Sequence, residues 1–123
     1  MTWDFQGDRP IYLQIVEQVQ LRIVSGYYPA GSKLPAVRDL AAEASVNPNT
    51  MQKALAELER KGLVYSQRTA GRFITEDRDM IESVKQSLAK EQVAEFLKKM
   101  RALGCTIGEA ITLLSQIEKE EAE

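Results

Sequence analysis

Apolar residues recur at three- and four-residue spacing along most of the chain, which is the pattern of amphipathic helices. The first such stretch covers residues 8–26, with Asp8 as the expected N-cap, and a shorter one covers residues 35–44. A third covers residues 47–62, where Asn47 precedes a proline that suits the first helical turn. The positions that these helices are expected to bury are Ile11, Ile15, Val16, Val19, Ile23, Val24, Val37, Leu40, Ala41, Met51, Ala54, Leu55 and Leu58.

Two short β segments follow the third helix, at residues 63–65 and 72–75. They flank a turn at residues 69–71, so a small hairpin is expected. The second and third helices are joined by the tight connection 45–47. Three helices followed by a hairpin, with such a connection between the last two helices, predict a winged helix-turn-helix.

The remaining residues predict two more helices, over 77–103 and from Thr106 onward, before an acidic end at 118–123. Thr106 and Glu109 have the spacing of a capping box. Two helices bury little apolar surface on their own, so their stripes predict dimerisation. The fold class is therefore mostly α with a small β-hairpin, divided into a winged domain at 1–75 and a helical dimerisation region at 76–123. The residues expected at the dimer interface are Ile81, Val84, Leu88, Phe96, Leu97, Met100, Ile111 and Leu114.

Composition excludes several classes of protein. The 123 residues leave room for one domain and an appendage. The chain has no histidine, no glycine-rich phosphate loop and no paired-carboxylate motif, so no catalytic residue, metal ligand or cofactor is predicted. No segment reaches the ~18 apolar residues of a membrane helix. Cys105 is the single cysteine, which favours a packing role over a redox sensor, and a cytoplasmic location is expected.

Charge is distributed unevenly along the chain, although the net charge is only −2. Residues 31–75 hold seven basic and four acidic side chains, a net charge of +3. Residues 76–123 hold seven basic and eleven acidic side chains, a net charge of −4. The basic excess in the first part is compatible with a local nucleic-acid surface.

Six sequence motifs within the first part make the prediction more specific. They are Pro10-Ile-Tyr-Leu-Gln-Ile15, Gly26-Tyr-Tyr-Pro-Ala-Gly31, Leu34-Pro-Ala-Val-Arg-Asp-Leu-Ala41, Val46-Asn-Pro-Asn-Thr50, Ala54-Leu-Ala-Glu-Leu-Glu59 and Gly62-Leu-Val64. In order and spacing they resemble the GntR family of bacterial transcription regulators over residues 9–75, and the short tail resembles its YtrA subfamily. The resemblance implies a homodimeric repressor of a palindromic operator that controls a transporter operon. Whether a small-molecule effector of unknown identity is a further partner stays open from the sequence.

The resemblance and side-chain chemistry together indicate which residues contact DNA. Arginine suits phosphate or guanine, asparagine and glutamine read adenine, and threonine and lysine favour phosphate. Arginines on the hairpin are expected in an adjacent minor groove. The residues assigned to DNA contact are Lys33, Arg38, Asn47, Asn49, Thr50, Gln52, Lys53, Arg68, Thr69 and Arg72.

Two departures from the family pattern affect these contacts. The family has serine at the position of Ala36, where a hydroxyl would cap the second helix and touch phosphate. Its wing reads Arg-Gly-x-Gly-Thr-Phe, whereas this chain has Arg68-Thr-Ala-Gly-Arg72-Phe73. Thr69 thus replaces a glycine and Arg72 adds a charge, so the wing's contact with DNA is expected to be redistributed.

Other interpretations stay open from the sequence. Arg38 is also placed to pair with Asp39 or Glu43. Asn47 is better explained as a helix cap, because Pro48 follows it, and a phosphate contact is its alternative. The aromatic side chains away from the third helix are more typical of packing than of base stacking. A non-catalytic protein-interaction module on a winged-helix scaffold is the alternative to a DNA-binding regulator, and it predicts no salt-dependent affinity for DNA.

Overall fold

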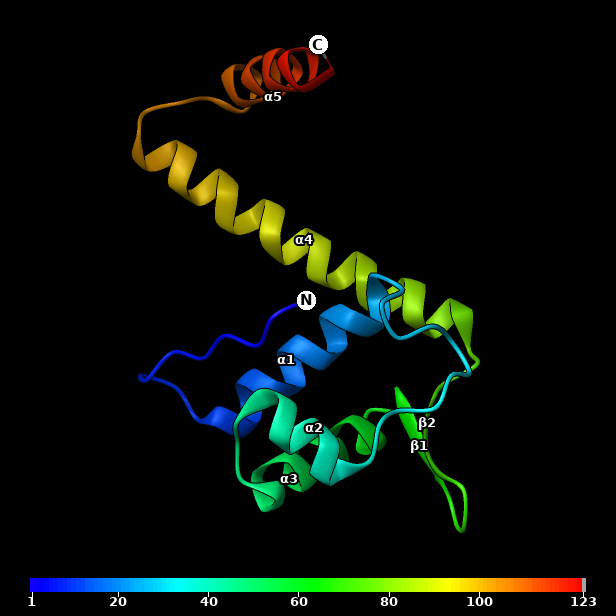
Figure 1. The fold of residues 1–123 in the computed structure, drawn as a ribbon. Coiled ribbons are helices and arrows are strands. Elements are labelled where there is room, and N and C mark those ends of the chain that lie inside the picture. The colour runs from blue at the N-terminus through cyan, green and yellow to red at the C-terminus, as the bar shows by residue number, and fades with distance from the viewer. Residues whose placement is uncertain (123) are drawn as a thin grey trace. The chain divides into compact units, whose positions relative to one another are not determined.

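The computed structural model describes residues 1–122; Glu123, the last residue of the acidic end, lies outside them. It confirms the mostly helical fold class, with one two-stranded sheet (Figure 1). The chain forms two compact units, Met1–Lys85 and Gln86–Glu123, called here the winged unit and the helical unit. The elements are α1 (Ile11–Val24), α2 (Val37–Ala44), α3 (Pro48–Arg60), β1 (Val64–Gln67), β2 (Gly71–Ile74), α4 (Arg78–Ala102) and α5 (Ile107–Ala122).

The winged unit is built around α3, which packs against α1, α2 and β1. In Figure 1, α2 and α3 lie side by side and the hairpin extends beside them. Most residues of the expected apolar stripes meet in one buried cluster, which Leu34, Leu63, Val64 and Ile74 complete from the loop and hairpin. Ile11 and Val37 are only partly buried against this cluster, and Val24 lies outside it. This cluster fixes how each helix is rotated, and so it decides which side chains face outward.

The hairpin pairs β1 with β2 in antiparallel register, from Val64 opposite Ile74 to Gln67 opposite Gly71. Both strands are displaced toward the tip from their expected positions, because the turn needs only residues 68–70. Lys33 forms a single bridge to Phe73, so the loop before α2 runs along β2. Gly71 has φ +108°, and a Cβ there would lie 3.0 Å from the Lys33 Cε. A side chain at position 71 would therefore strain the wing.

Helix ends follow the sequence in two places and differ from it in two. The Asn47 side chain accepts a hydrogen bond from the Asn49 N–H at 2.8 Å, and Thr106 and Glu109 form the reciprocal capping box at 3.1 Å each. The expectation of an Asp8 cap is wrong, because Pro10 is the N-cap of α1. Helix α2 begins at Val37, later than the expected start near residue 35, because its N-cap Ala36 keeps an extended backbone.

The helical unit consists of the C-terminal part of α4 and the whole of α5. Among its described residues only Ala110 is buried. The first turns of α4 belong to the winged unit, because Met80, Ile81 and Val84 pack against its core. The division between units thus falls at Lys85, inside α4, rather than at the end of the hairpin. In the part of the chain that the structure describes, no helix combines the length and hydrophobicity needed to cross a membrane.

Candidate nucleic-acid interface

The outer face of α3 carries polar side chains at its N-terminal end. Burial of the opposite stripe leaves Asn49, Gln52 and Lys53 exposed and Thr50 half-buried. The side-chain oxygen of Asn47 is used by the helix cap, which supports its structural role. The start of α3 therefore presents amide and hydroxyl groups that match the hydrogen-bonding edges of bases and phosphates.

Arg38 lies on the exposed side of α2, and no residue among 1–122 forms a hydrogen bond or ion pair with its guanidinium. One expected alternative partner, Glu43, is turned elsewhere: its Oε1 accepts from Trp3 Nε1 at 3.1 Å and lies 3.6 Å from Arg22. Asp39, the other expected partner, lines the cleft between α2 and the wing and forms no ion pair with Arg38 among the described residues. Arg38 thus keeps its five donors for a partner outside the chain.

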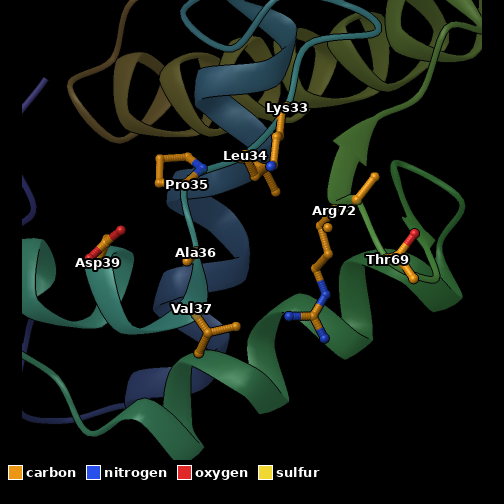
Figure 2. Close-up of a pocket in the computed structure, with 10 residues that line it drawn as sticks. Lys33, Leu34, Pro35, Ala36, Val37, Asp39, Thr69 and Arg72 are labelled. Atoms are coloured by element: carbon orange, nitrogen blue, oxygen red, sulfur yellow. The ribbon is translucent and has the colours of Figure 1, made fainter.

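A cleft of about 790 Å³ separates the start of α2 from the wing (Figure 2). Its wall includes Lys33, Ala36, Thr69 and Arg72. Because Ala36 has no polar side chain, the first N–H groups of α2 are left for an acceptor from outside, and a helix N-terminus favours an anion. The first turn of α2 also carries the acidic Asp39, so this end of the helix combines open N–H donors with one carboxylate.

Arg72 does not extend freely from the hairpin, as a minor-groove contact would. Its Nε donates to Glu59 Oε1 at 2.7 Å, and its Nη1 donates to Gln52 Oε1 at 3.3 Å. Figure 2 shows the side chain running from β2 toward α3. The Arg72 side chain is only 18% exposed, so it ties the wing to α3.

Glu59 is the residue on which this tie depends. The Ser66 hydroxyl donates to Glu59 Oε1, and this hydrogen bond, followed by that from Arg72, holds the pKa of Glu59 below its ordinary value although partial burial acts against it. Sequence reasoning did not single out Glu59 or Ser66. The signal was Arg72, whose charge at a usually neutral wing position calls for a nearby carboxylate.

The remaining predicted contacts fall into two groups. Lys53 lies over the Tyr12 ring, with Nζ 3.8 Å from its centre, so α1 holds this lysine in place. Arg68 and Thr69 are exposed at the hairpin tip and have no hydrogen-bond partner among residues 1–122. The wing thus has one arginine free at the tip and another fixed against α3.

The other aromatic side chains pack within the protein. Trp3, Tyr27 and Tyr28 surround the buried Arg22, whose guanidinium carbon lies 3.7 Å from the centre of the Trp3 ring system. Among residues 1–122 there is no group of three or more Asp, Glu or Cys side chains that would hold a metal ion. The surface formed by α2, α3 and the wing is consequently the strongest candidate for a binding site.

Known proteins share both the sequence and the fold of this chain. The family model "Bacterial regulatory proteins, gntR family" matches residues 11–74. The uncharacterised HTH-type transcriptional regulator YhcF of Bacillus subtilis is 42% identical over 106 residues, 86% of this chain and 88% of its own. The HTH-type transcriptional repressor YtrA of Bacillus subtilis is 37% identical over 95 residues, 76% of this chain and 73% of its own.

Solved structures extend the comparison to three dimensions. A GntR family transcriptional regulator from Listeria monocytogenes matches with a TM-score of 0.84 and 39% identity, over 91% of this chain and 98% of that one. The DNA-binding domain of AraR in complex with its operator ORX1 matches with a TM-score of 0.55 and 28% identity, over 61% of this chain and 99% of that one. Winged fold, family model and relatives agree: this chain belongs to the GntR family of transcription regulators, is similar to its YtrA members, and is not an enzyme.

Proposed function

We propose that the protein is a homodimeric repressor that binds a palindromic operator through α2, α3 and the wing. The observation that carries this proposal is the exposure of polar side chains on the two helices of the helix-turn-helix, Arg38 in the first turn of α2 and Asn49 and Gln52 in the first turns of α3. These groups face outward while the opposite side of both helices fills the core. The related YtrA is a repressor, which supports this direction of regulation.

The first turns of α3 enter the major groove in this proposal, as the recognition helix of a helix-turn-helix does. Asn49 and Gln52 face base edges, while Thr50 and Lys53 are nearer the phosphates. Arg38 and Lys33 contact the backbone at the open end of α2, and Arg68 at the hairpin tip reaches the neighbouring minor groove. Operator binding by AraR, a structural relative, supports this arrangement.

A second copy of the chain is the proposed cover for the apolar face of the helical unit. A groove of about 490 Å³ between α4 and α5 is lined by Val93, Phe96, Leu97, Ile107, Ala110, Ile111 and Leu114, with Gln92 at its edge. Val93 is 55% exposed and Leu114 is 53% exposed, although both are apolar. Ile81 and Val84 contribute to the winged unit's own core, so we propose that the interface is formed mainly by the residues beyond Lys85.

Dimerisation by a two-fold axis presents two copies of α3 to DNA, which is why a palindromic operator is proposed. The half-sites are then about 34 Å apart, one helical turn. Such a regulator acts where the chromosome lies, which in a prokaryotic cell is the cytoplasm. Its resemblance to the YtrA subfamily suggests an operon with transporter genes as the target.

Selection of bound sequences from a random double-stranded DNA pool, followed by affinity measurements over a salt series, tests the proposal. We expect enrichment of one palindromic sequence and a steep fall in affinity with salt, because each phosphate contact releases counterions. Absence of any enriched sequence, together with no salt-dependent binding, would contradict it and favour a protein-interaction module.

A further inference from the structure

The contact between Arg72 and Gln52 joins the wing to the side chain that the proposed function places against a base. Gln52 is exposed near the start of α3, and its Oε1 accepts from Arg72 Nη1 at 3.3 Å. Residues 52 and 72 come from different elements, twenty positions apart. A contact of this kind allows the wing to influence how α3 reads a base.

The chemistry of the two groups fixes which end of the Gln52 amide faces Arg72. A guanidinium has five N–H donors and no acceptor, so only the amide oxygen can bond to it. The amide nitrogen of Gln52 is left facing away from Arg72. This assignment follows from donor and acceptor types and does not depend on telling oxygen from nitrogen in the amide.

Arg72 is itself held in place by a carboxylate. Glu59 accepts from Arg72 Nε and from the Ser66 hydroxyl, and the Glu59 side chain is 31% exposed. Ser66 lies on β1, Arg72 on β2 and Glu59 on α3, so the network crosses from the sheet to the helix. The direction of each bond is fixed, because the Glu59 carboxylate can only accept and the Arg72 guanidinium can only donate: Ser66 and Arg72 both donate to Glu59, and Arg72 also donates to Gln52.

We propose that Arg72 is a positioning residue for base recognition: it orients Gln52 so that the pair presents mainly donors and selects guanine over adenine at the facing base pair. This inference rests on the proposed function. Arg72 keeps three N–H groups after its bonds to Glu59 and Gln52, and Gln52 keeps two. Only one lone pair of Gln52 Oε1 remains as an acceptor.

Guanine and adenine present different hydrogen-bonding groups in the major groove. Guanine offers two acceptors, O6 and N7, which match a donor-rich pair. Adenine offers one acceptor, N7, and one donor, N6, and glutamine reads both only when its oxygen is turned to N6. A Gln52 amide held with its oxygen toward Arg72 is therefore better suited to guanine than the free side chain would be.

The test uses the full-length protein and the operator recovered by selection, with each half-site position changed in turn between G·C and A·T. Wild-type protein is expected to prefer guanine about tenfold at one position in each half-site. Arg72→Thr and Arg72→Lys are expected to reduce this ratio to about twofold or less, since neither keeps the planar fork. Gln52→Ala should also abolish the preference for guanine over adenine. Adding Arg72→Thr to Gln52→Ala should then cause no further change in this preference.

Arg68→Thr is the matched control, because Arg68 lies on the same hairpin and is exposed at its tip. This variant is expected to weaken binding to the guanine and adenine versions of the operator equally, so the preference for guanine should not change. If Arg72→Thr perturbs folding, Glu59→Gln provides the second variant, since it weakens the anchor of Arg72 and leaves both Arg72 and Gln52 in place. A reduced ratio in Glu59→Gln would support the same network.

Three results would overturn the inference, and they are distinguishable. Equal weakening of guanine and adenine sites by Arg72→Thr would show that Arg72 only builds the wing. A wild-type preference for adenine at the position that Gln52→Ala affects would show the opposite amide orientation. Failure of wild-type protein to bind any selected DNA would contradict the proposed function itself, and this inference with it.

Discussion

Apolar side chains are buried in the winged unit but largely exposed in the helical unit. In the winged unit, Ile15, Leu55 and Leu58 are completely buried in one cluster shared by helices and hairpin. In the helical unit, Ile111 is 58% exposed and Phe96 is 37% exposed, and Ala110 is the one buried residue among those described. The first unit has a core of its own, whereas the second has apolar surface that water still contacts.

This contrast indicates that the two units have different roles, one in holding a binding surface and the other in association. A closed core holds α2, α3 and the wing in a fixed geometry, which a DNA-reading surface requires. An open apolar face of similar composition stabilises little by itself but favours association with a complementary surface. Matched substitutions in the two units should therefore have different effects.

The largest difference is expected for the same truncation made in each unit. Leu55→Ala should reduce the free energy of unfolding by about 2–5 kcal/mol, because it leaves a cavity in a sealed core. Leu114→Ala removes the same atoms from a half-exposed position and should leave unfolding of the winged unit unchanged. Denaturant unfolding followed by circular dichroism measures both, and equal losses would contradict the contrast between the units.

A charge placed in the groove of the helical unit is expected to break the proposed dimer. Ile111→Glu would bury a carboxylate in an apolar interface, which is unfavourable, so sedimentation analysis should give a monomer. Operator affinity should fall with it, while the melting of the winged unit stays the same. Gln116→Glu, on the opposite side of α5, is the control. A dimer that persists in Ile111→Glu would place the interface elsewhere.

Basic residues in the two units should differ in their effect on DNA binding. Arg38→Ala is expected to weaken operator binding by about 1–3 kcal/mol and to reduce the steepness of its salt dependence, because its guanidinium is free for phosphate or guanine. Arg101→Ala, in the helical unit, should have a negligible effect. Fluorescence anisotropy with labelled operator at several salt concentrations provides the measurement. Equal effects of the two variants would remove Arg38 from the interface.

The smallest effect concerns pH and the anchor of the wing. The pKa of Glu59 is lower in the folded protein than its ordinary value of 4.5, chiefly because of the Ser66 hydroxyl and also because of Arg72. The ionised carboxylate therefore stabilises the fold above that ordinary value, and the stabilisation is lost as pH falls through the lower, folded pKa. Melting of wild type and Glu59→Gln should differ near neutral pH and converge in acid. Glu95→Gln, in the helical unit, should follow wild type throughout, and a difference that grows in acid would contradict the assignment.

Local signals in the sequence were enough for the elements and the family. Asn47 before a proline, the Thr106–Glu109 pair and the apolar spacing each act within one or two helical turns, and the structure reproduces them. The prediction of an Asp8 cap failed because the side chain of Gln14, a buried residue of α1, forms hydrogen bonds with the backbone of Gln6 and Arg9. These bonds hold the segment before α1 against the helix. Such a contact has no local signature.

The sequence by itself determined that three helices and a hairpin form a winged fold, that the tail is helical and apolar, and which residues carry donors and acceptors. Tertiary structure alone decided their partners: Arg72 reaches Glu59 and Gln52 on α3, Lys53 rests on Tyr12, and Arg38 stays free. Periodicity reports which face of an element is buried, because that depends on neighbouring positions in the same element. Hydrogen bonds between elements depend on packing angle and register, which only the assembled core establishes.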